Sequence, residues 1–421
     1  MTLAGFQQRS EDLARALAVA LGVSLPFSVA ADGVLLALVL ACWLAADRYR
    51  ERWATLRLHP IALMALGFVA LLAVGVAYGE QPRSDAVLYF RKYADLVVLG
   101  VFVTLFGDAA WRRRAFLALA AGLAVLVWLS YLVKLGLVPR NPWLRGTPDY
   151  PVVALDSLTH GILVAFGAFL FAVLGRQAPR GPVRTTWFAL AAAAAANVLF
   201  IVPGRTGYVV LAVLALYLGY VWRRLAGLAL VALGGAALVA VGVAASSTLQ
   251  TRLAETAQQV REWQPGVAAQ TSVGYRLEFY YNTLKIIRDR PFVGAGTGGF
   301  PSAYERQVAG TAMAPARHPH NEYLHLTAQL GVAGLAALLA LFWVPWRLAP
   351  RLPLPHERVL ARGLVLTIAV GCVFNSLLLD HTEGLFFAWG LGVLFGGLGP
   401  HATASGDGAH PPSAARAEPQ R

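Results

Sequence analysis

The segment His318-Pro319-His320-Asn321-Glu322 places two histidines just before a long apolar run that begins near residue 321. Imidazole titrates near neutral pH, so His320 is a candidate general base that accepts a proton from an attacking group. An interfacial helix cap is the alternative, because Asn321 and Glu322 both favour a first helical turn. A zinc site built from His318, His320 and His325 is weaker: these spacings do not share one helix face, and no cysteine or carboxylate pair completes the set.

Two arginines are candidates for binding an anion. Arg205 lies in the tight turn Pro203-Gly204-Arg205-Thr206-Gly207 between two apolar runs, and Arg276 lies early in a polar segment, within Gly274–Glu278. A guanidinium presents several donors in a fixed fork that suits phosphate. Arg205 is also placed to anchor at lipid headgroups, and Arg276 to pair with Glu278. The sequence leaves these alternatives open.

Other charged residues are candidates for holding a substrate. The basic residues before the fourth apolar run can bind a lipid phosphate or act as ordinary anchors, whereas the cation Arg288 also suits the dipole of a helix end. The turn Asp380-His381-Thr382-Glu383 offers carboxylates that can balance an arginine or steer a histidine, or simply cap a helix. The candidates for substrate binding are Arg91, Lys92, Asn321, Arg288 and Asp380.

The stretch Gly294 to Gly299 matches the pattern G-x-G-x-x-G. Dinucleotide-binding loops with this pattern follow a strand and open a helix. This stretch instead follows a predicted helix and a proline, so we reject that interpretation. We predict a turn in which glycines allow the backbone to approach another group closely. No cofactor is expected.

Composition indicates what positions these residues. Of 421 residues, 57% are hydrophobic and only 14% are charged, against about 25% charged in soluble domains. Mean hydropathy is +0.58, and apolar runs of about 20 residues recur, the length that crosses a bilayer. We predict an all-α, polytopic membrane protein with about twelve transmembrane helices near 13–30, 33–46, 60–78, 93–107, 113–135, 157–175, 187–202, 206–222, 225–245, 321–344, 359–379 and 384–399.

The basic residues orient this bundle. If the N-terminus is cytoplasmic, 20 of the 35 Lys and Arg fall in cytoplasmic segments, 8 in one long outer loop and 7 in short outer loops. The positive-inside rule discounts the long loop, so both termini are predicted to be cytoplasmic. Because the net charge of +13 comes from these short loops, it does not indicate nucleic-acid binding.

The long outer loop covers about residues 246–320. Its first part carries Leu249, Leu253, Ala257, Val260 and Trp263 on one helical face, which predicts an amphipathic helix on the membrane surface or against the rest of the loop. A second helix is expected from Val273 to Asp289. We predict one transmembrane domain over 1–400 that includes this loop, and a disordered cytoplasmic tail over 401–421, which is rich in Ala, Gly, Pro and Ser.

These motifs together resemble bacterial O-antigen ligases and their superfamily. His320-Asn321, nine residues, Gly331, two residues and Gly334 reproduce the signature H-N-x9-G-x-x-G. The run from Gly274-Tyr275-Arg276 through Pro291 and Gly294 to Phe300 resembles the arginine-helix-proline-glycine segment of the same superfamily, and Arg205 matches its other essential arginine. The resemblance also covers helix number, topology and loop placement.

The resemblance implies a membrane glycosyltransferase (GT-C-like) fold in the bacterial inner membrane and metal-independent, inverting chemistry on the periplasmic face. O-antigen would move from undecaprenyl pyrophosphate to lipid A–core oligosaccharide, with His320, Arg276 and Arg205 as catalytic residues. O-antigen polymerases and protein O-oligosaccharyltransferases are alternatives within the superfamily; a single large outer loop favours the ligase. A lipid-linked glycan transporter is the alternative of another class. Transporters place ionisable residues at the bilayer midplane, and few lie there in this sequence.

Overall fold

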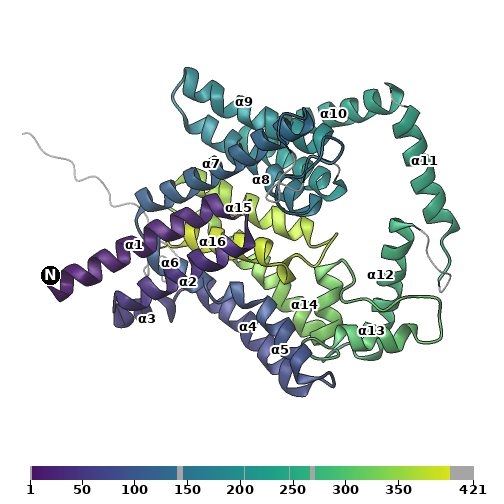
Figure 1. Ribbon diagram of the computed structural model, residues 1–421, viewed down its shortest axis with the longest axis horizontal. Helices are drawn as coiled ribbons and strands as arrows, with labels where there is room; N and C mark the ends of the chain where they lie inside the picture. The colour runs from purple at the N-terminus through teal and green to yellow at the C-terminus, as the bar shows by residue number, and fades with distance from the viewer. Residues whose placement is uncertain (1, 140–145, 203, 246, 266–270, 399–421) are drawn as a thin grey trace, which may run out of the picture.

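The computed structural model describes residues 2–139, 146–202, 204–245, 247–265 and 271–398, and Figure 1 shows these as an all-helical bundle. Short 3-10 turns and one π-helical turn, Asn197–Ile201, interrupt or join the helices. The α-helices are α1 Leu3–Ser24, α2 Val29–Ala45, α3 Tyr49–Leu56, α4 Pro60–Tyr78, α5 Arg83–Lys92, α6 Leu99–Leu105, α7 Ala109–Lys134, α8 Ser157–Gln177, α9 Pro182–Ala196, α10 Arg205–Ala245, α11 Ser247–Glu262, α12 Ser272–Asp289, α13 Phe300–Val308, α14 Glu322–Leu348, α15 Pro355–Gly371 and α16 His381–Phe395.

The sequence marks many of the helix starts. Asp108 caps α7 by accepting from the backbone of Ala110, and Asp156 caps α8 by accepting from Leu158. The helices α4, α9 and α15 begin with proline, which lacks the N–H group that a helix start leaves unpaired. These local signals fix where the apolar segments enter the bundle.

Helices α8 and α16 form its centre. Their facing aromatic residues Phe166 and Phe386 pack edge to face with ring centroids 5.1 Å apart. Trp389 of α16 is fully buried and donates its indole N–H to the carbonyl of Ala18 in α1. Such packing of large apolar side chains around two central helices holds the N-terminal and C-terminal halves of the chain together.

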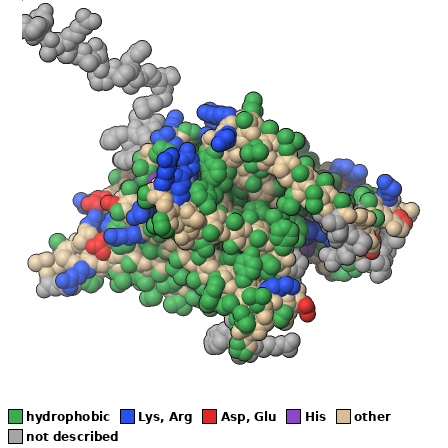
Figure 2. Space-filling view, turned by 90° about the horizontal axis from the view of Figure 1, so that it is seen from above, with side chains coloured by type: hydrophobic (Ala, Val, Ile, Leu, Met, Phe, Trp, Pro, Cys, Tyr) green, Lys and Arg blue, Asp and Glu red, His purple; other side chains and the backbone are tan. Residues whose placement is uncertain are grey.

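Within the described residues, six helices are long and apolar enough to cross a membrane, or seven if the sharply bent pair α2–α3 is one span. Figure 2 shows hydrophobic side chains over much of one face, with charged side chains gathered towards its margins. The all-helical fold expected from the sequence is therefore confirmed, and the length and composition of these helices are consistent with a membrane protein. Each of the twelve predicted ranges contains helical residues, although the number of crossings stays a prediction.

The predicted ranges 93–107 and 359–379 are not continuous straight helices. Residues 93–107 form a 3-10 turn, Ala94–Leu96, and the short α6. In the range 359–379, α15 ends at Gly371 and an irregular segment follows. The chain also folds back inside α10 at Arg223 and Arg224, where a Cβ on Gly227 would collide with the carbonyl oxygen of Gly219. This fold-back separates the ranges 206–222 and 225–245 as the sequence predicts.

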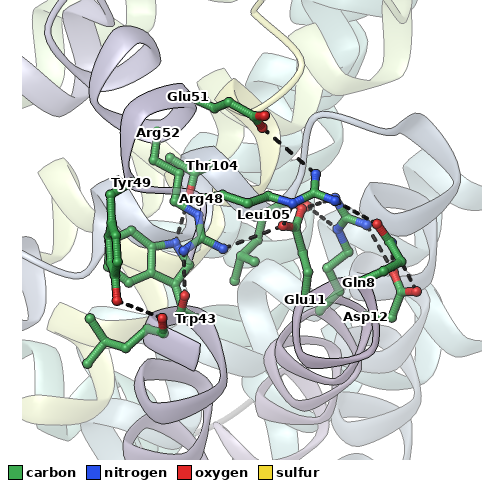
Figure 3. Close-up of polar contacts among 12 residues, drawn as sticks. Gln8, Glu11, Asp12, Trp43, Arg48, Tyr49, Glu51, Arg52, Thr104 and Leu105 are labelled. Carbon is green, nitrogen blue, oxygen red and sulfur yellow. Dashed lines mark hydrogen bonds and ion pairs between the residues drawn. The ribbon is translucent and has the colours of Figure 1, made fainter. Parts of the chain in front are cut away.

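At one end of the bundle, basic side chains are neutralised by acids and carbonyl groups (Figure 3). Buried Glu11 of α1 lies 3.0 Å from Arg48 and 3.5 Å from Arg52. Arg112 of α7 binds Glu357 of α15 at 2.7 Å, and both are buried. We call this the arginine end, comprising Glu11, Arg15, Arg48, Arg52, Arg112 and Glu357. Arg15 and Arg112 bond to carbonyls of Leu105 and Phe106, which brings these helix ends together.

The loop between α10 and α14 contains α11, α12 and α13 and has a small apolar core of its own. Buried Phe300, Tyr304 and Ile286 pack with Ala328 of α14. Helix α12 spans Ser272–Asp289, within one residue of the predicted start. Helix α11 stands away from the bundle in Figure 1. Its Val260 is exposed, while Trp263 beyond its end contacts the ring of Tyr281.

Candidate active site

His320 lies directly before α14 in a strained backbone conformation. Its φ is +54°, a left-handed value that residues with a side chain rarely adopt. The His320 N–H donates to Nδ1 of His318 at 3.3 Å, and its carbonyl accepts from the Tyr280 hydroxyl at 3.4 Å. Asn321 then caps α14 by accepting from the backbone N–H of Leu324. Strain of this kind, held by neighbouring contacts, is typical of functional positions.

The ring of His320 is wedged between aromatic and polar partners. It stacks on Phe279 with ring centroids 5.7 Å apart and contacts the ring of His318 at 4.4 Å. Its Nδ1 lies 3.0 Å from Oδ1 of Asn375. Burial lowers the pKa of His320, the hydrogen bond to Asn375 raises it, and the nearby charge of Arg276 lowers it again. The ring is therefore neutral at pH 7 and able to accept a proton.

His318 is the companion of His320 rather than a second free base. Burial, followed by repulsion from His320 and Lys92, lowers the pKa of His318 to about 4. Its Nδ1 lone pair is already occupied by the backbone N–H of His320. His325, the third histidine of this stretch, is fully buried between Tyr89 and Phe300. No group of three metal-binding side chains lies close enough to hold an ion among the described residues.

The turn before α16 brings an acidic residue to His320. Asp380 Oδ2 accepts from Nδ2 of Asn375 at 3.4 Å, so Asn375 lies between the carboxylate and the imidazole. Burial raises the pKa of Asp380, while Lys92 opposes and Asp156 adds to this increase. Glu383, the other acid of this turn, is buried in the bundle and accepts from the Thr159 hydroxyl at 2.6 Å. Asp380 is therefore the acid on the side of His320.

Four of the predicted cations lie at the end of the bundle that carries His320. None of them makes an ion pair or a side-chain hydrogen bond among the described residues. Arg276 is in the first turns of α12, one turn before Phe279, and is close enough to His320 to lower its pKa. Lys92 ends α5 and acts on both His318 and Asp380. Arg91 precedes it and is exposed. The fourth cation, Arg205, begins α10.

Arg205 is joined to this end through helix packing. Gly207 of α10 packs directly on Gly161 of α8, where an added Cβ would lie 3.0 Å from the Gly161 backbone. The first turn of α8 in turn holds Glu383 through Thr159. The starts of α8, α10, α14 and α16 thus share one end of the bundle, which we call the His320 end and define by Arg91, Lys92, Arg205, Arg276, His318, His320, Asn375 and Asp380.

Arg288 is not part of this group. It lies nine residues beyond Phe279 on α12, which corresponds to about 13 Å along the helix axis. Its side chain is 79% exposed, and its only ion pair within the described residues, at 3.8 Å, is with the adjacent Asp289. Asn321 is at the right place, but its side-chain oxygen caps α14 and its nitrogen donates to the carbonyl of Val373 at 3.0 Å. Its amide is thus occupied by backbone.

The glycine-rich loop fastens the outer segment to the bundle. Gly294, Gly296 and Gly298 have positive φ values, and the loop donates from Ala295 and Gly296 to carbonyls of α14 at 2.9 and 2.7 Å. Those carbonyls are free because α14 breaks at Gly331, where φ is +64°. A Cβ on Gly296 would collide with Gly79. The predicted close backbone approach is confirmed. The signature glycines have a structural role, because Gly331 breaks α14 and a Cβ on Gly334 would lie 2.5 Å from the carbonyl oxygen of Leu326.

Sequence reasoning missed three residues around His320: Phe279, Tyr280 and Asn375. Two are aromatic residues on a helix and carry no distinctive pattern. Asn375 was absorbed into a predicted membrane helix. A polar amide near the end of an apolar run is the signal that could have found it, because lipid-facing helices rarely carry one without a partner.

Residues 190–339 match the family model described as O-antigen ligase. The matched segment contains Arg205, Arg276, His320, Gly331 and Gly334, whereas Arg91, Lys92, Asn375 and Asp380 lie outside it. No curated protein matches the chain.

Proposed function

We propose that this chain is an O-antigen ligase, because its residues 190–339 match the family model described as O-antigen ligase. It transfers O-antigen polysaccharide from undecaprenyl pyrophosphate to lipid A–core oligosaccharide and so completes lipopolysaccharide. The observation that carries the chemistry is the position of half-buried His320, whose pKa is lowered chiefly by burial, beside Arg276, a cation that has no acidic partner among the described residues.

In the proposed reaction, a hydroxyl of the acceptor sugar attacks the anomeric carbon of the donor. Neutral His320 takes the hydroxyl proton, and the bond from the anomeric carbon to the diphosphate oxygen breaks with its electron pair. The single displacement inverts the anomeric centre. It needs a proton acceptor on one side of the sugar and stabilisation of the departing charge on the other.

The departing lipid diphosphate carries the developing negative charge. Preorganised cations stabilise such charge without reorganising during the reaction. Arg276 and Arg205 are assigned to the diphosphate, and Lys92 and Arg91 to its lipid side. Asp380 is assigned to the His320 side through Asn375. Asn321 is assigned to positioning the mouth of α14, because its amide is taken up by backbone groups.

The same proposal includes the topology. Twelve helical segments cross the inner membrane in a GT-C-like arrangement, both termini are cytoplasmic, and the His320 end faces the periplasm. Residues 1–400 act as one transmembrane domain with the 246–320 loop above it; the tail 401–421 lies outside the described residues. The 20-to-7 distribution of basic residues in short loops supports this orientation.

Polymerase and protein O-oligosaccharyltransferase are the competing functions, because the family match does not distinguish between acceptors. Analysis of lipopolysaccharide in a deletion strain separates them. Loss of all O-antigen with accumulation of lipid-linked polymer is expected for the ligase. Core bearing a single repeat indicates the polymerase, and intact lipopolysaccharide with loss of protein glycans indicates the transferase.

A transporter of lipid-linked glycan is the alternative from another class. Purified protein in detergent, given lipid-linked O-antigen and lipid A–core, should form product although no membrane gradient exists. A transporter would form none. His356, partly buried at the start of α15, offers a matched control for the base: His356→Ala should retain transfer, whereas His320→Ala should lose it.

A further inference from the structure

The two ring nitrogens of His320 have different surroundings. Nδ1 is 3.0 Å from Oδ1 of Asn375, and Nδ2 of the same amide is 3.4 Å from Oδ2 of Asp380. A carboxylate only accepts hydrogen bonds, so the NH2 group of Asn375 faces Asp380 and its carbonyl oxygen faces His320. That oxygen also only accepts. The proton of neutral His320 therefore resides on Nδ1.

We propose that Asn375 is a positioning residue that holds His320 in the Nδ1-protonated form, leaving the Nε2 lone pair to receive the proton of the acceptor hydroxyl. The inference deepens the proposed function and rests on it for the role of His320. During transfer, the proton moves from the hydroxyl to Nε2 while the new glycosidic C–O bond forms and the bond to diphosphate breaks. The resulting imidazolium keeps Nδ1–H on Asn375 and later releases the Nε2 proton to water.

An amide suits this position better than a carboxylate would. Four charged or titratable groups surround His320. Arg276 of α12 and His318 of the same loop face it directly, Lys92 of α5 lies beyond His318, and Asp380 lies beyond Asn375. A carboxylate at 375 would hold a proton on His320 and would draw Arg276 towards an ion pair. The amide orients the ring without a net charge, so the base stays neutral and the arginine stays available for an anion.

The backbone that carries Asn375 is held independently of its side chain. The carbonyl of Val373 accepts from Tyr280 and from Asn321, each at 3.0 Å. Glu322 donates its N–H to the carbonyl of Cys372 at 2.8 Å and accepts from the N–H of Leu378 at 3.1 Å. Substitutions at 375 should consequently change the partner of His320 while leaving the segment 372–379 in place.

The kinetic experiment uses purified full-length protein in detergent with lipid-linked O-antigen and lipid A–core. Asn375→Leu should lower kcat about ten- to hundredfold, the size typical of removing a partner that orients a functional histidine. Asn375→Asp keeps the acceptor and should recover part of the transfer at high pH, although its carboxylate also competes with the diphosphate for Arg276. In the pH profile of kcat/KM, the acidic limb of the Asp variant should move to higher pH by about one unit or more. The acidic limb of the Leu variant should move to lower pH.

Wild-type kcat and an unchanged pH profile in Asn375→Leu would overturn the inference. If His320→Ala is inactive in the same assay, the proposed base survives that result. If His320→Ala transfers normally, the base assignment itself fails. A loss in Asn375→Leu that Asn375→Asp does not recover, with no movement of the acidic limb, would show that Asn375 acts only on structure.

A second measurement does not depend on transfer. In protein labelled with 15N-histidine, the signals missing from His320→Gln identify His320 among the nine histidines of the chain. At neutral pH these signals should report a protonated Nδ1 and an unprotonated Nε2. Asn375→Leu should lose this preference. A protonated Nε2 in the wild-type protein would exclude the proposed arrangement whatever the kinetics show.

Discussion

At the arginine end, Glu11 accepts from arginines of α1 and α3, and Arg112 is buried against Glu357. At the His320 end, Arg276, Arg205 and Lys92 make no ion pair within the part of the chain that the structure describes. Both ends are rich in arginine, but only at the arginine end do acidic side chains pair with it. Paired and buried cations join helices, whereas unpaired cations around a neutral histidine are suited to an anion that arrives with a substrate.

The difference explains why sequence composition alone does not separate the two sets. Orienting arginines and anion-binding arginines are the same residue type in loops of similar length. The distinction depends on which acidic side chains fold against the arginines. Glu11 is 41 residues from its partner Arg52 in the sequence, and Glu357 is 245 residues from its partner Arg112. Substitutions at the two ends should therefore have opposite signatures.

The largest expected effect is on chemistry at the His320 end. His320→Ala should reduce transfer about a hundredfold to ten-thousandfold, as removal of a general base typically does. Initial rates in detergent, compared with His356→Ala, measure it. Thermal stability should change little, because the ring is only half-buried. Transfer at the wild-type rate would mean that the proton goes elsewhere.

Arg112→Ala at the arginine end should instead destabilise the fold. It leaves Glu357 buried without its partner, which typically costs about 3–5 kcal/mol. Thermal unfolding in detergent checks this, with the exposed neighbour Arg113→Ala as the matched control. Folded Arg112→Ala protein should transfer glycan at a normal rate per molecule. A specific loss of kcat without a change in Tm would contradict the contrast between the two ends.

Arg276→Ala and Arg205→Ala should show the reverse pattern. Each removes a charged hydrogen bond to diphosphate worth about 1.5–3 kcal/mol, or about a ten- to hundredfold loss of kcat/KM. Tm should stay near wild type because neither arginine has an ion-pair partner in the described structure. Lysine at 205 keeps the charge and loses the fork; full activity of Arg205→Lys would indicate a point charge only. A fall in Tm equal to that of Arg112→Ala would argue for a structural role.

Acidification should weaken the His320 end through the imidazoles of His318 and His320. The pKa of His318 is about 4 in the folded protein, below its ordinary value of 6.5, and that of His320 is lowered as well. The unfolded chain therefore binds more protons below pH 6.5, so this stability is present above pH 6.5 and is lost as pH falls towards 4. Tm should drop between pH 7 and pH 5, and His318→Gln should flatten this slope. An unchanged slope in His318→Gln would rule out its contribution.

Much of the architecture could be predicted because it follows from local rules. The apolar runs, the proline starts of α4 and α15, and the Arg290-Pro291 stop after α12 are written in neighbouring residues. The break in α14 at Gly331 could not be assigned locally, since it depends on the loop at Gly294 inserting its N–H groups against free carbonyls.

The site was predictable where residue type alone decides the role. His320 stood out because a histidine at a helix mouth can act as a base, and Arg276 because it lies in a motif that resembles that of the O-antigen ligases. Asn375 did not, because its importance comes from lying 3.0 Å from a residue 55 positions earlier in the chain. The irregular segment that presents it replaces the last part of a helix that hydropathy predicts over 359–379. Tertiary hydrogen bonds from Tyr280 and Asn321 stabilise that departure.

Arg288 provides the smallest and most discriminating test of the comparison. Its type and loop match those of Arg276, but it lies at the opposite end of α12 and is exposed, and its only ion pair in the described part of the chain is a long contact with Asp289. Exposed pairs of this kind contribute little stability. Arg288→Ala should therefore change the free energy of unfolding by less than about 0.5 kcal/mol and leave transfer unchanged. A loss of transfer matching that of Arg276→Ala would extend the anion-binding surface along the whole of α12 and would show that proximity to His320 is not what selects the working arginines.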